Sequence, residues 1–334
     1  MRNKPTAVWT LERWEQLFEN LRRCVLSAES DKVAWLRVAA AARLVLKTYS
    51  TSFFLVTRFL PTAKRRQVDV IYAAVRYPDE LVDTFGPSGL NAEQRLDSWS
   101  NGYTAALGTT HLRETVAKGV NPFLAAFVEV IRRNIIPHGY YCDFLGAMRC
   151  DLQPSSFTTL TSLIDEYVYG SAVVVGYFLT YVYGASTPGN FSRATSCAKN
   201  LGIALQLTNF ARDIYDDQLR GRLYVPQDVL AATGALHTKT GTVAHQAALA
   251  DARRQLAHIA EDYYERATSA LDAYSVDSRI AIKACINVYR QLNMMILTSS
   301  NVLPKRYSVP VHQKFLALPA SKYWRLPLAY MGWL

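Results

Sequence analysis

Apolar residues recur at the spacing of an α-helix through most of this 334-residue sequence, and that periodicity limits the fold more than any other feature. From Asp31 to Lys47 the chain is rich in Ala and Leu, with apolar residues at i, i+3 and i+4. Pro61 suits the first turn of a second helix. The same pattern predicts further helices over residues 91–107, 122–136, 140–150, 159–183, 193–217, 243–274 and 276–300. Strand alternation is weak and no Asn-Gly hairpin signal occurs, so the sequence predicts an all-α fold.

The sequence has few features that would divide the chain into separate domains. With 50% apolar residues, 16 Gly and 13 Pro, and no linker rich in Ser, Gly or Pro, a single compact helical domain is expected. We assign residues 1–30 to an N-terminal extension, 31–300 to the helical domain and 301–334 to a C-terminal tail. Within the domain, the glycines and proline of residues 218–241 predict a loop.

The charge of the chain points to an anionic partner. A net charge of +10 and a pI near 9.3 suit nucleic acid, an anionic membrane or a phosphorylated metabolite. The densest basic run, Lys64 to Arg66, is short, so nucleic acid is not expected. Five scattered cysteines without a CxxC pair argue against a disulfide framework or a zinc site. Met1 to Thr10 contain no apolar run that would serve as a signal peptide, and we expect a cytoplasmic protein.

One uncharged stretch, residues 167–192, is long enough to cross a bilayer. It is interrupted by Gly170, Gly176, Gly184 and Pro188. We therefore interpret it as a buried helix of a large bundle.

Polar residues form a stripe on one predicted helix, where apolar residues should lie. Gln206, Asn209, Asp213 and Asp217 follow at steps of three, four and four, so they share one face. Burying unpaired carboxylates would cost several kcal/mol each. The stripe must therefore face water, a metal or a polar ligand.

A second stripe contains Tyr72, Arg76, Asp79 and Asp83 at steps of four, three and four. Carboxylates four residues apart repel each other on a bare helix, and a divalent cation would relieve that repulsion. Oxygen ligands of this kind suit Mg²⁺, with Mn²⁺ as a substitute. A single DxxxD motif is more often a solvated helix face paired with Arg or Lys. Two such motifs, each with an Arg and apolar flanks, favour metal binding.

At these residues the sequence resembles the squalene and phytoene synthase family. The family's first signature is matched by Tyr72, Arg76 and the run from Asp79 to Asp83, whose Asp-Glu-Leu-Val-Asp form resembles phytoene synthases in particular. Its second signature is matched by Asn209, Arg212, Asp213 and Asp217, followed by the basic loop that includes Arg222, Tyr224 and Pro226.

Three further elements extend the resemblance from about Thr48 to Gln291. Ser50 to Phe53 is similar to a Ser-x-Ser-Phe element, and Tyr167 to Gly176 resembles a helix of small residues. Tyr289 stands where the family has a late tyrosine. Two departures are visible. Pro78 should kink the first acidic helix or start a new turn, and Val173 and Val174 make the small-residue helix bulkier.

The resemblance implies an isoprenoid-synthase-type helical bundle around a central cavity, with prenyl diphosphates as substrates. The metal ligands it implies are Asp79, Asp83, Asp213 and Asp217, and it assigns catalytic roles to Tyr72, Arg76 and Arg212 as well. Binding of the prenyl diphosphates is expected from Ser52, Phe53, Tyr167, Gln206, Asn209, Arg222 and Tyr289. Apolar walls would protect a carbocation from water, and we count Phe54, Val175, Leu179 and Leu205 among them.

The product that the resemblance implies is phytoene, formed head to head from two geranylgeranyl diphosphates without NADPH. One alternative is squalene, hydroxysqualene or dehydrosqualene from farnesyl diphosphate. Others are a head-to-tail prenyltransferase or terpene cyclase, and a non-catalytic helical binding protein. The aromatic tail from Tyr323 to Leu334 predicts either peripheral membrane contact or packing on the bundle.

Overall fold

The computed structural model describes residues 9–85, 91–153, 156–219, 222–298 and 307–331. These residues contain helices and one isolated bridge between Ala185 and Tyr274, but no β-strand. The predicted all-α fold is confirmed. The helices gather into two compact units, which we call unit 1 (residues 1–152 and 326–334) and unit 2 (residues 153–325).

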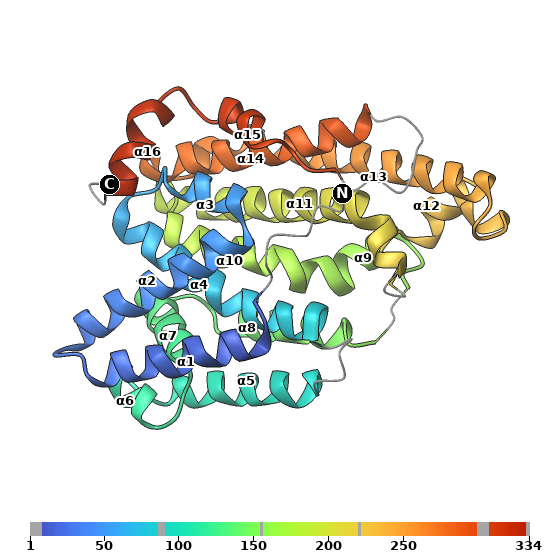
Figure 1. The fold of residues 1–334 in the computed structure, drawn as a ribbon. Coiled ribbons are helices and arrows are strands. Elements are labelled where there is room, and N and C mark those ends of the chain that lie inside the picture. The colour runs from blue at the N-terminus through green and yellow to red at the C-terminus, as the bar shows by residue number, and fades with distance from the viewer. Residues whose placement is uncertain (1–8, 86–90, 154–155, 220–221, 299–306, 332–334) are drawn as a thin grey trace. The chain divides into compact units, whose positions relative to one another are not determined.

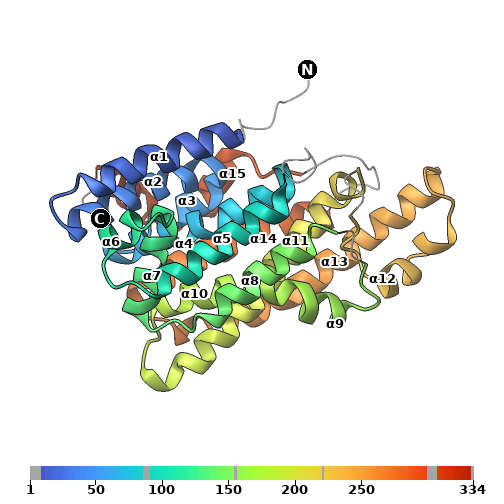
Figure 2. The same cartoon turned by 90° about the horizontal axis from the view of Figure 1, so that it is seen from below.

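Unit 1 is built from eight α-helices and one π-helix of the first half of the chain (Figure 1). They are α1 (Leu11–Leu26), α2 (Asp31–Tyr49), α3 (Thr51–Thr57), α4 (Thr62–Glu80), η1 (Leu81–Phe85), α5 (Ala92–Leu107), α6 (Leu112–Ala117), α7 (Pro122–Asn134) and α8 (Gly139–Cys150). α4 packs against α2 and α7, and α8 lies beside α5, as Figure 2 shows from below.

Tyr141 of α8 fixes α4 in the core of unit 1. Its side chain is fully buried, and its hydroxyl donates to the Ala74 carbonyl over 2.7 Å while it accepts from Trp99 Nε1 over 2.8 Å. Ala74 lies between Tyr72 and Arg76 on α4. The buried hydroxyl therefore holds the part of α4 that carries Tyr72 and Arg76 to the rest of unit 1, because a broken bond here would leave polar atoms unsatisfied.

Unit 2 contains the longer helices of the second half of the chain. They are α9 (Leu160–Leu163), the π-helix η3 (Ile164–Val173), α10 (Val174–Tyr183), η4 (Pro188–Asn190), α11 (Phe191–Leu219), α12 (Gln227–Ala232), η5 (Ala235–His237), α13 (Val243–Ser269), η6 (Leu271–Ala273), α14 (Val276–Leu297) and α15 (Val311–Ala317). α16 (Lys322–Met331) contains the boundary between the units.

The core of unit 2 forms where α11 packs along α13 (Figure 1). Thr208 of α11 is fully buried, with its hydroxyl 3.1 Å from the Tyr264 hydroxyl of α13 and 3.3 Å from Asn293 Oδ1 of α14. Gly202 lets η3 approach α11, because a Cβ atom there would lie 3.2 Å from the Ala172 carbonyl oxygen and from the Val173 Cα. The small residues of these helices thus serve close packing. Val173 and Val174 are both fully buried.

The predicted helices differ from the observed ones in several places, and the short helices α3, α6, α15 and α16 were not predicted. The loop predicted at 218–241 is wrong at its start, where α11 continues to Leu219, and at α12 and η5. The helix predicted over 159–183 contains the π-helix η3, and the one over 243–274 ends as α13 at Ser269. The polar sequence of α1 gave no helix prediction, yet Trp14 of α1 is fully buried in unit 1. None of the described helices has the length and apolar character needed to span a bilayer.

Candidate active site

The first acidic motif, which we define as Arg76, Asp79 and Asp83, lies at the C-terminal end of α4 and in η1. Pro78 does not end α4. The helix continues to Glu80 and is followed by the π-helix η1, which carries Asp83. Proline removes one backbone donor and crowds the preceding turn, which favours a wider turn nearby. The two carboxylates are therefore separated by a change of helix type, which the sequence pattern did not predict.

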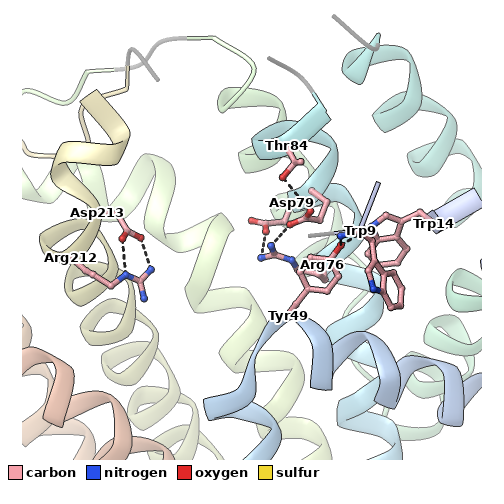
Figure 3. Close-up of polar contacts among 9 residues, drawn as sticks. Trp9, Trp14, Tyr49, Arg76, Asp79, Thr84, Arg212 and Asp213 are labelled. Carbon is pink, nitrogen blue, oxygen red and sulfur yellow. Dashed lines mark hydrogen bonds and ion pairs between the residues drawn. The ribbon is translucent and has the colours of Figure 1, made fainter. Parts of the chain in front are cut away.

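Arg76 is the cation of this motif (Figure 3). It donates from Nη1 to Asp79 Oδ2 over 2.6 Å and also pairs with Glu80, and its guanidinium lies 4.5 Å from the centre of the Tyr49 ring. Burial lowers the pKa of Arg76, but the neighbouring Asp79, Tyr72, Glu80 and Asp83 outweigh that effect and raise the pKa overall. Arg76 is thus held in its charged form.

Among the described residues that act on Asp79, whose side chain is 35% exposed, carboxylates outnumber cations. Burial raises the pKa of Asp79 to about 7; Arg76 opposes this shift, while Asp83, Glu80 and Asp151 add to it. Burial also raises the pKa of Glu80, which is 1% exposed. The surroundings of Asp79 therefore carry an excess of negative charge that a bound cation would relieve.

Tyr49 and Glu80 are site residues that the sequence analysis missed. The Tyr49 hydroxyl accepts from Trp14 Nε1 over 3.0 Å and from the Trp9 backbone over 3.3 Å, as Figure 3 shows. Its ring supports the Arg76 guanidinium. Glu80 follows Asp79 directly in the sequence, but the i, i+4 spacing predicts only the two aspartates as site residues.

The second acidic motif, which we define as Asn209, Arg212, Asp213 and Asp217, lies on α11 in unit 2. Its members and Gln206 are half-buried, whereas Leu207, Phe210, Ala211 and Ile214 of the same helix are buried. The predicted stripe therefore exists as one accessible face of a continuous α-helix. Asp213 is 18% exposed and Arg212 is 22% exposed.

Among the described residues, Arg212 forms its ion pair with Asp213. Its Nε lies 2.7 Å from Asp213 Oδ1 and its Nη2 lies 2.5 Å from Asp213 Oδ2, a two-pronged pair visible in Figure 3. Burial lowers the pKa of Arg212, but Asp213, with Tyr289 of α14 and Asp217, raises it overall.

Lys314 of α15 is a further cation near Arg212 that no sequence motif marked. Burial lowers the pKa of Lys314, and the charge of Arg212 lowers it further. Among the described residues of unit 2, Lys314 therefore adds a second cation beside Arg212. Arg222, predicted as a third, donates its backbone N–H to the Asp217 carbonyl over 2.9 Å.

The remaining predicted residues divide between the units. In unit 1, Phe53 and Tyr72 are half-buried, with ring centres 6.0 Å apart, and Ser52 lies beside Phe53 on α3. In unit 2, Tyr167 is buried and stacks on Tyr224 at 5.1 Å. Val175, Leu179, Leu205 and Tyr289 are half-buried.

Phe54 is the exception among the expected cavity walls. It is buried 4.3 Å from the Arg58 guanidinium, which pairs with Asp69 over 2.8 Å in the core of unit 1. A phenyl ring covered in this way serves packing within unit 1.

Both motifs offer the ligands that Mg²⁺ prefers. Among the described residues, no group of three or more His, Cys, Asp or Glu side chains converges as a complete metal site. Paired carboxylates suit an ion that keeps several waters and completes its shell with substrate phosphates. The donor atoms and the carboxylate excess around Asp79 both fit such an ion.

Comparison with known proteins agrees with these motifs. Residues 46–313 match the family model for squalene/phytoene synthase. The chain is 30% identical to a 15-cis-phytoene synthase of Enterobacter agglomerans over 81% of this chain and 90% of that protein. It is also 30% identical to one of Synechococcus elongatus over 84% and 90%.

Solved structures show the same fold. A dehydrosqualene synthase superimposes with a TM-score of 0.69 at 24% identity, over 88% of this chain and 98% of that one. The squalene synthase HpnC from Alicyclobacillus acidocaldarius gives a TM-score of 0.61 at 22% identity, over 78% and 92%. Since the family model covers most of the sequence, the chain belongs to the squalene/phytoene synthase family and is a prenyltransferase.

Proposed function

We propose that this enzyme joins two geranylgeranyl diphosphates head to head to give phytoene. The observation that carries the proposal is that both acidic motifs are intact. In each, an arginine forms an ion pair with the first aspartate. A non-catalytic relative would have no need to retain two half-exposed carboxylate pairs. The relatives named phytoene synthase, at 30% identity over most of both chains, support the twenty-carbon substrate.

The first step is loss of diphosphate from an allylic carbon, which leaves a carbocation. The C–O bond breaks only if the charge of the departing diphosphate is neutralised. Arg212 and the neighbouring Lys314 in unit 2 would donate to phosphate oxygens, as Arg76 would in unit 1. Asp79 with Asp83, and Asp213 with Asp217, would hold Mg²⁺, which supplies further positive charge to the diphosphate when bound.

The second step joins the two chains. The double bond of the second substrate attacks the cation, and loss of a proton closes a cyclopropylcarbinyl diphosphate. A second ionisation, rearrangement and proton loss then give the hydrocarbon. Half-buried aromatic side chains such as Phe53 and Tyr72 would exclude water and face the cation with their rings.

The product identifies the function. Purified enzyme is supplied with Mg²⁺ and either geranylgeranyl or farnesyl diphosphate, with and without NADPH, and the hydrocarbon is identified by mass. We expect a forty-carbon product from the twenty-carbon substrate, independent of NADPH. A thirty-carbon product alone, or strict dependence on NADPH, would assign the enzyme to squalene-type synthesis instead.

We also propose that α15 and the start of α16 rest on a membrane surface, where a hydrocarbon product must go. Val311, Leu316, Tyr323 and Trp324 are 72%, 67%, 69% and 51% exposed. Large apolar and aromatic side chains of this kind favour the membrane interface. Sedimentation with anionic vesicles should carry the wild-type protein down, and replacing Leu316 and Trp324 with Ser should leave it in the supernatant.

A further inference from the structure

An open cavity of about 390 Å³, lined by both polar and apolar side chains, lies at the surface of unit 2, and the proposed reaction does not use it. One wall is a face of α11 that presents Ser196, Lys199, Asn200 and Ile203 at helical spacing. Lys199 precedes Asp213 by fourteen residues on this helix, which corresponds to about 21 Å along its axis. The cavity is therefore a separate place from the second acidic motif.

The base of the cavity is apolar and its rim is polar. Ile203 is 1% exposed and Ile164, at the start of η3, is 8% exposed. Tyr263 of α13 adds an aromatic ring, and the Arg266 guanidinium lies 5.0 Å from the centre of that ring. The tyrosine thus holds the arginine at the rim, because an aromatic face attracts a cation.

The polar side chains of the rim have no partners of their own within the part of the chain that the structure describes. Lys199, Asn200 and Ser196 make no side-chain hydrogen bond or ion pair there, and Arg266 contacts only the Tyr263 ring. Some other exposed cations are paired, as Arg193 is with Asp272 over 2.7 Å. Donors that converge on a cavity without partners are a feature of ligand sites.

The charges select the ligand. Lys199 and Arg266 face the cavity with one carboxylate, that of Asp165, so a single anionic group is favoured. Lys and Arg together bind phosphate oxygens well, and Ser and Asn can donate further hydrogen bonds. The volume falls at the lower end of the range of about 300–1,000 Å³ for small-molecule sites.

We propose that this cavity binds a small organic phosphate. Its phosphate accepts hydrogen bonds from Lys199 and Arg266, and its carbon part lies on Ile203 and Tyr263. Asp165 accepts from a hydroxyl of the ligand and disfavours a second anionic group. The site is independent of the proposed reaction, because it needs neither the acidic motifs nor Mg²⁺.

Phenyl phosphate is a suitable probe, since its ring and its phosphate match the base and the rim. Binding to the full-length protein is measured by calorimetry in EDTA, so that no metal at the acidic motifs attracts the phosphate. We expect saturable binding that is at least about fivefold tighter than that of inorganic phosphate, because the ring adds buried apolar area. No saturable binding, or equal affinity for the two probes, would overturn the proposal.

Charge variants locate the site. Lys199→Gln and Arg266→Gln should each weaken phenyl phosphate binding about tenfold, and Asp165→Asn should tighten it. Lys283→Gln, which changes an exposed lysine of α14 outside the cavity, is the matched control and should bind as the wild type does. Equal loss in the Lys283 variant, or no loss in the Lys199 and Arg266 variants, contradicts the proposal.

A lipid headgroup could supply the same phosphate chemistry, and vesicles containing phosphatidic acid separate the two sources. For a soluble ligand, Lys199→Gln should weaken phenyl phosphate binding and leave vesicle binding unchanged. If the variant instead loses vesicle binding and keeps phenyl phosphate binding, the proposed site is a lipid site and the proposal fails.

Discussion

The two acidic motifs share a spacing of aspartates and an arginine, but they differ in what surrounds them. Among the described residues that act on Asp79, the carboxylates of Asp83, Glu80 and Asp151 act together against Arg76. Around Asp213, the cations Arg212 and Lys314 are neighbours in unit 2. The same motif is therefore set in a negative environment in unit 1 and in a more positive one in unit 2.

This difference suggests a division of roles. An excess of carboxylates favours a divalent cation, whereas additional cations favour the phosphate oxygens of the leaving group. In both motifs the arginine pairs with the first aspartate. We infer that metal and diphosphate replace these internal pairs, so that each arginine becomes available to the substrate.

The largest expected effect comes from removing either first aspartate. Asp79→Asn and Asp213→Asn should each lower turnover by about a thousandfold or more, because each removes a carboxylate that would hold the Mg²⁺ needed to neutralise the departing diphosphate. An equal loss is expected when the wild-type enzyme is assayed in excess EDTA. The measurement is hydrocarbon formed per enzyme with saturating substrate.

Asp272→Asn is the control for this pair, since Asp272 forms an exposed pair with Arg193. It should retain full turnover. Activity retained in one aspartate variant and lost in the other would show that only one motif is needed for ionisation.

Replacing Arg76 should mainly lower stability, whereas replacing Arg212 should mainly lower activity. Arg76→Gln leaves Glu80, which is 1% exposed, without its cation, and should lower the free energy of unfolding by about 3 kcal/mol. Arg212→Gln leaves Asp213, which is 18% exposed, and should cost much less stability. It should nevertheless lower kcat/KM about a hundredfold through loss of a donor to the diphosphate.

Urea unfolding and steady-state kinetics of both variants make this comparison. Arg23→Gln removes an exposed pair with Glu19, whose side chain is 61% exposed, and should change the free energy of unfolding by less than about 1 kcal/mol. If both arginine variants lose stability equally, the contrast between the motifs is wrong.

A smaller effect is expected at Lys314. Lys314→Gln removes the second cation near Arg212 and should weaken inhibition by inorganic diphosphate about three- to tenfold, with little change in stability. Lys283→Gln changes an exposed lysine of α14 and should leave inhibition unchanged. An unchanged inhibition constant in the Lys314 variant would limit the positive environment to Arg212.

The second acidic motif was more predictable than the first, for a physical reason. α11 is a continuous α-helix, so a period of 3.6 residues places Asn209, Asp213 and Asp217 correctly on one face. In the first motif, Pro78 precedes a change to a π-helix, and no apolar period in the sequence announces that change. η3 escaped prediction in the same way, because its residues fit an α-helical pattern equally well.

Other site features depend on tertiary packing, which a local pattern does not contain. Tyr49 reaches Arg76 across the packing of α2 on α4, and Lys314 approaches Arg212 from α15. Trp14 of α1 is fully buried, although residues 1–30 were predicted to form an N-terminal extension. The motifs therefore predict the carboxylates and arginines of the site, whereas tertiary packing brings Tyr49 and Lys314 close to those arginines.

The smallest expected effect is a pH dependence that tests the negative environment of Asp79 directly. In the metal-free protein the pKa of Asp79 is about 7, whereas an unfolded aspartate has a pKa of about 3.9. Between these values the folded state binds the proton more tightly, so stability contributed by Asp79 falls as pH rises through this window. The Asp79→Asn variant has no carboxyl group that titrates at this position, so it does not lose stability in this window. Its thermal midpoint in EDTA should exceed that of the wild type by an amount that grows from pH 5 to pH 7 and is constant above.

Asp272→Asn provides a control of opposite sign. The pair with Arg193 lowers the pKa of Asp272, so the wild-type residue stabilises the fold at neutral pH and loses that contribution only as pH falls below the range of an ordinary aspartate. This variant should therefore be equal to or slightly less stable than the wild type, with no change between pH 5 and pH 8. The difference in thermal midpoint between Asp79→Asn and the wild type should not be constant across this range, nor have the same sign as that of Asp272→Asn. Either result would mean that Arg76 already balances the carboxylates of the first acidic motif. In that case the two motifs would be electrostatically alike, and the proposed division between metal binding and diphosphate binding would lose its physical basis.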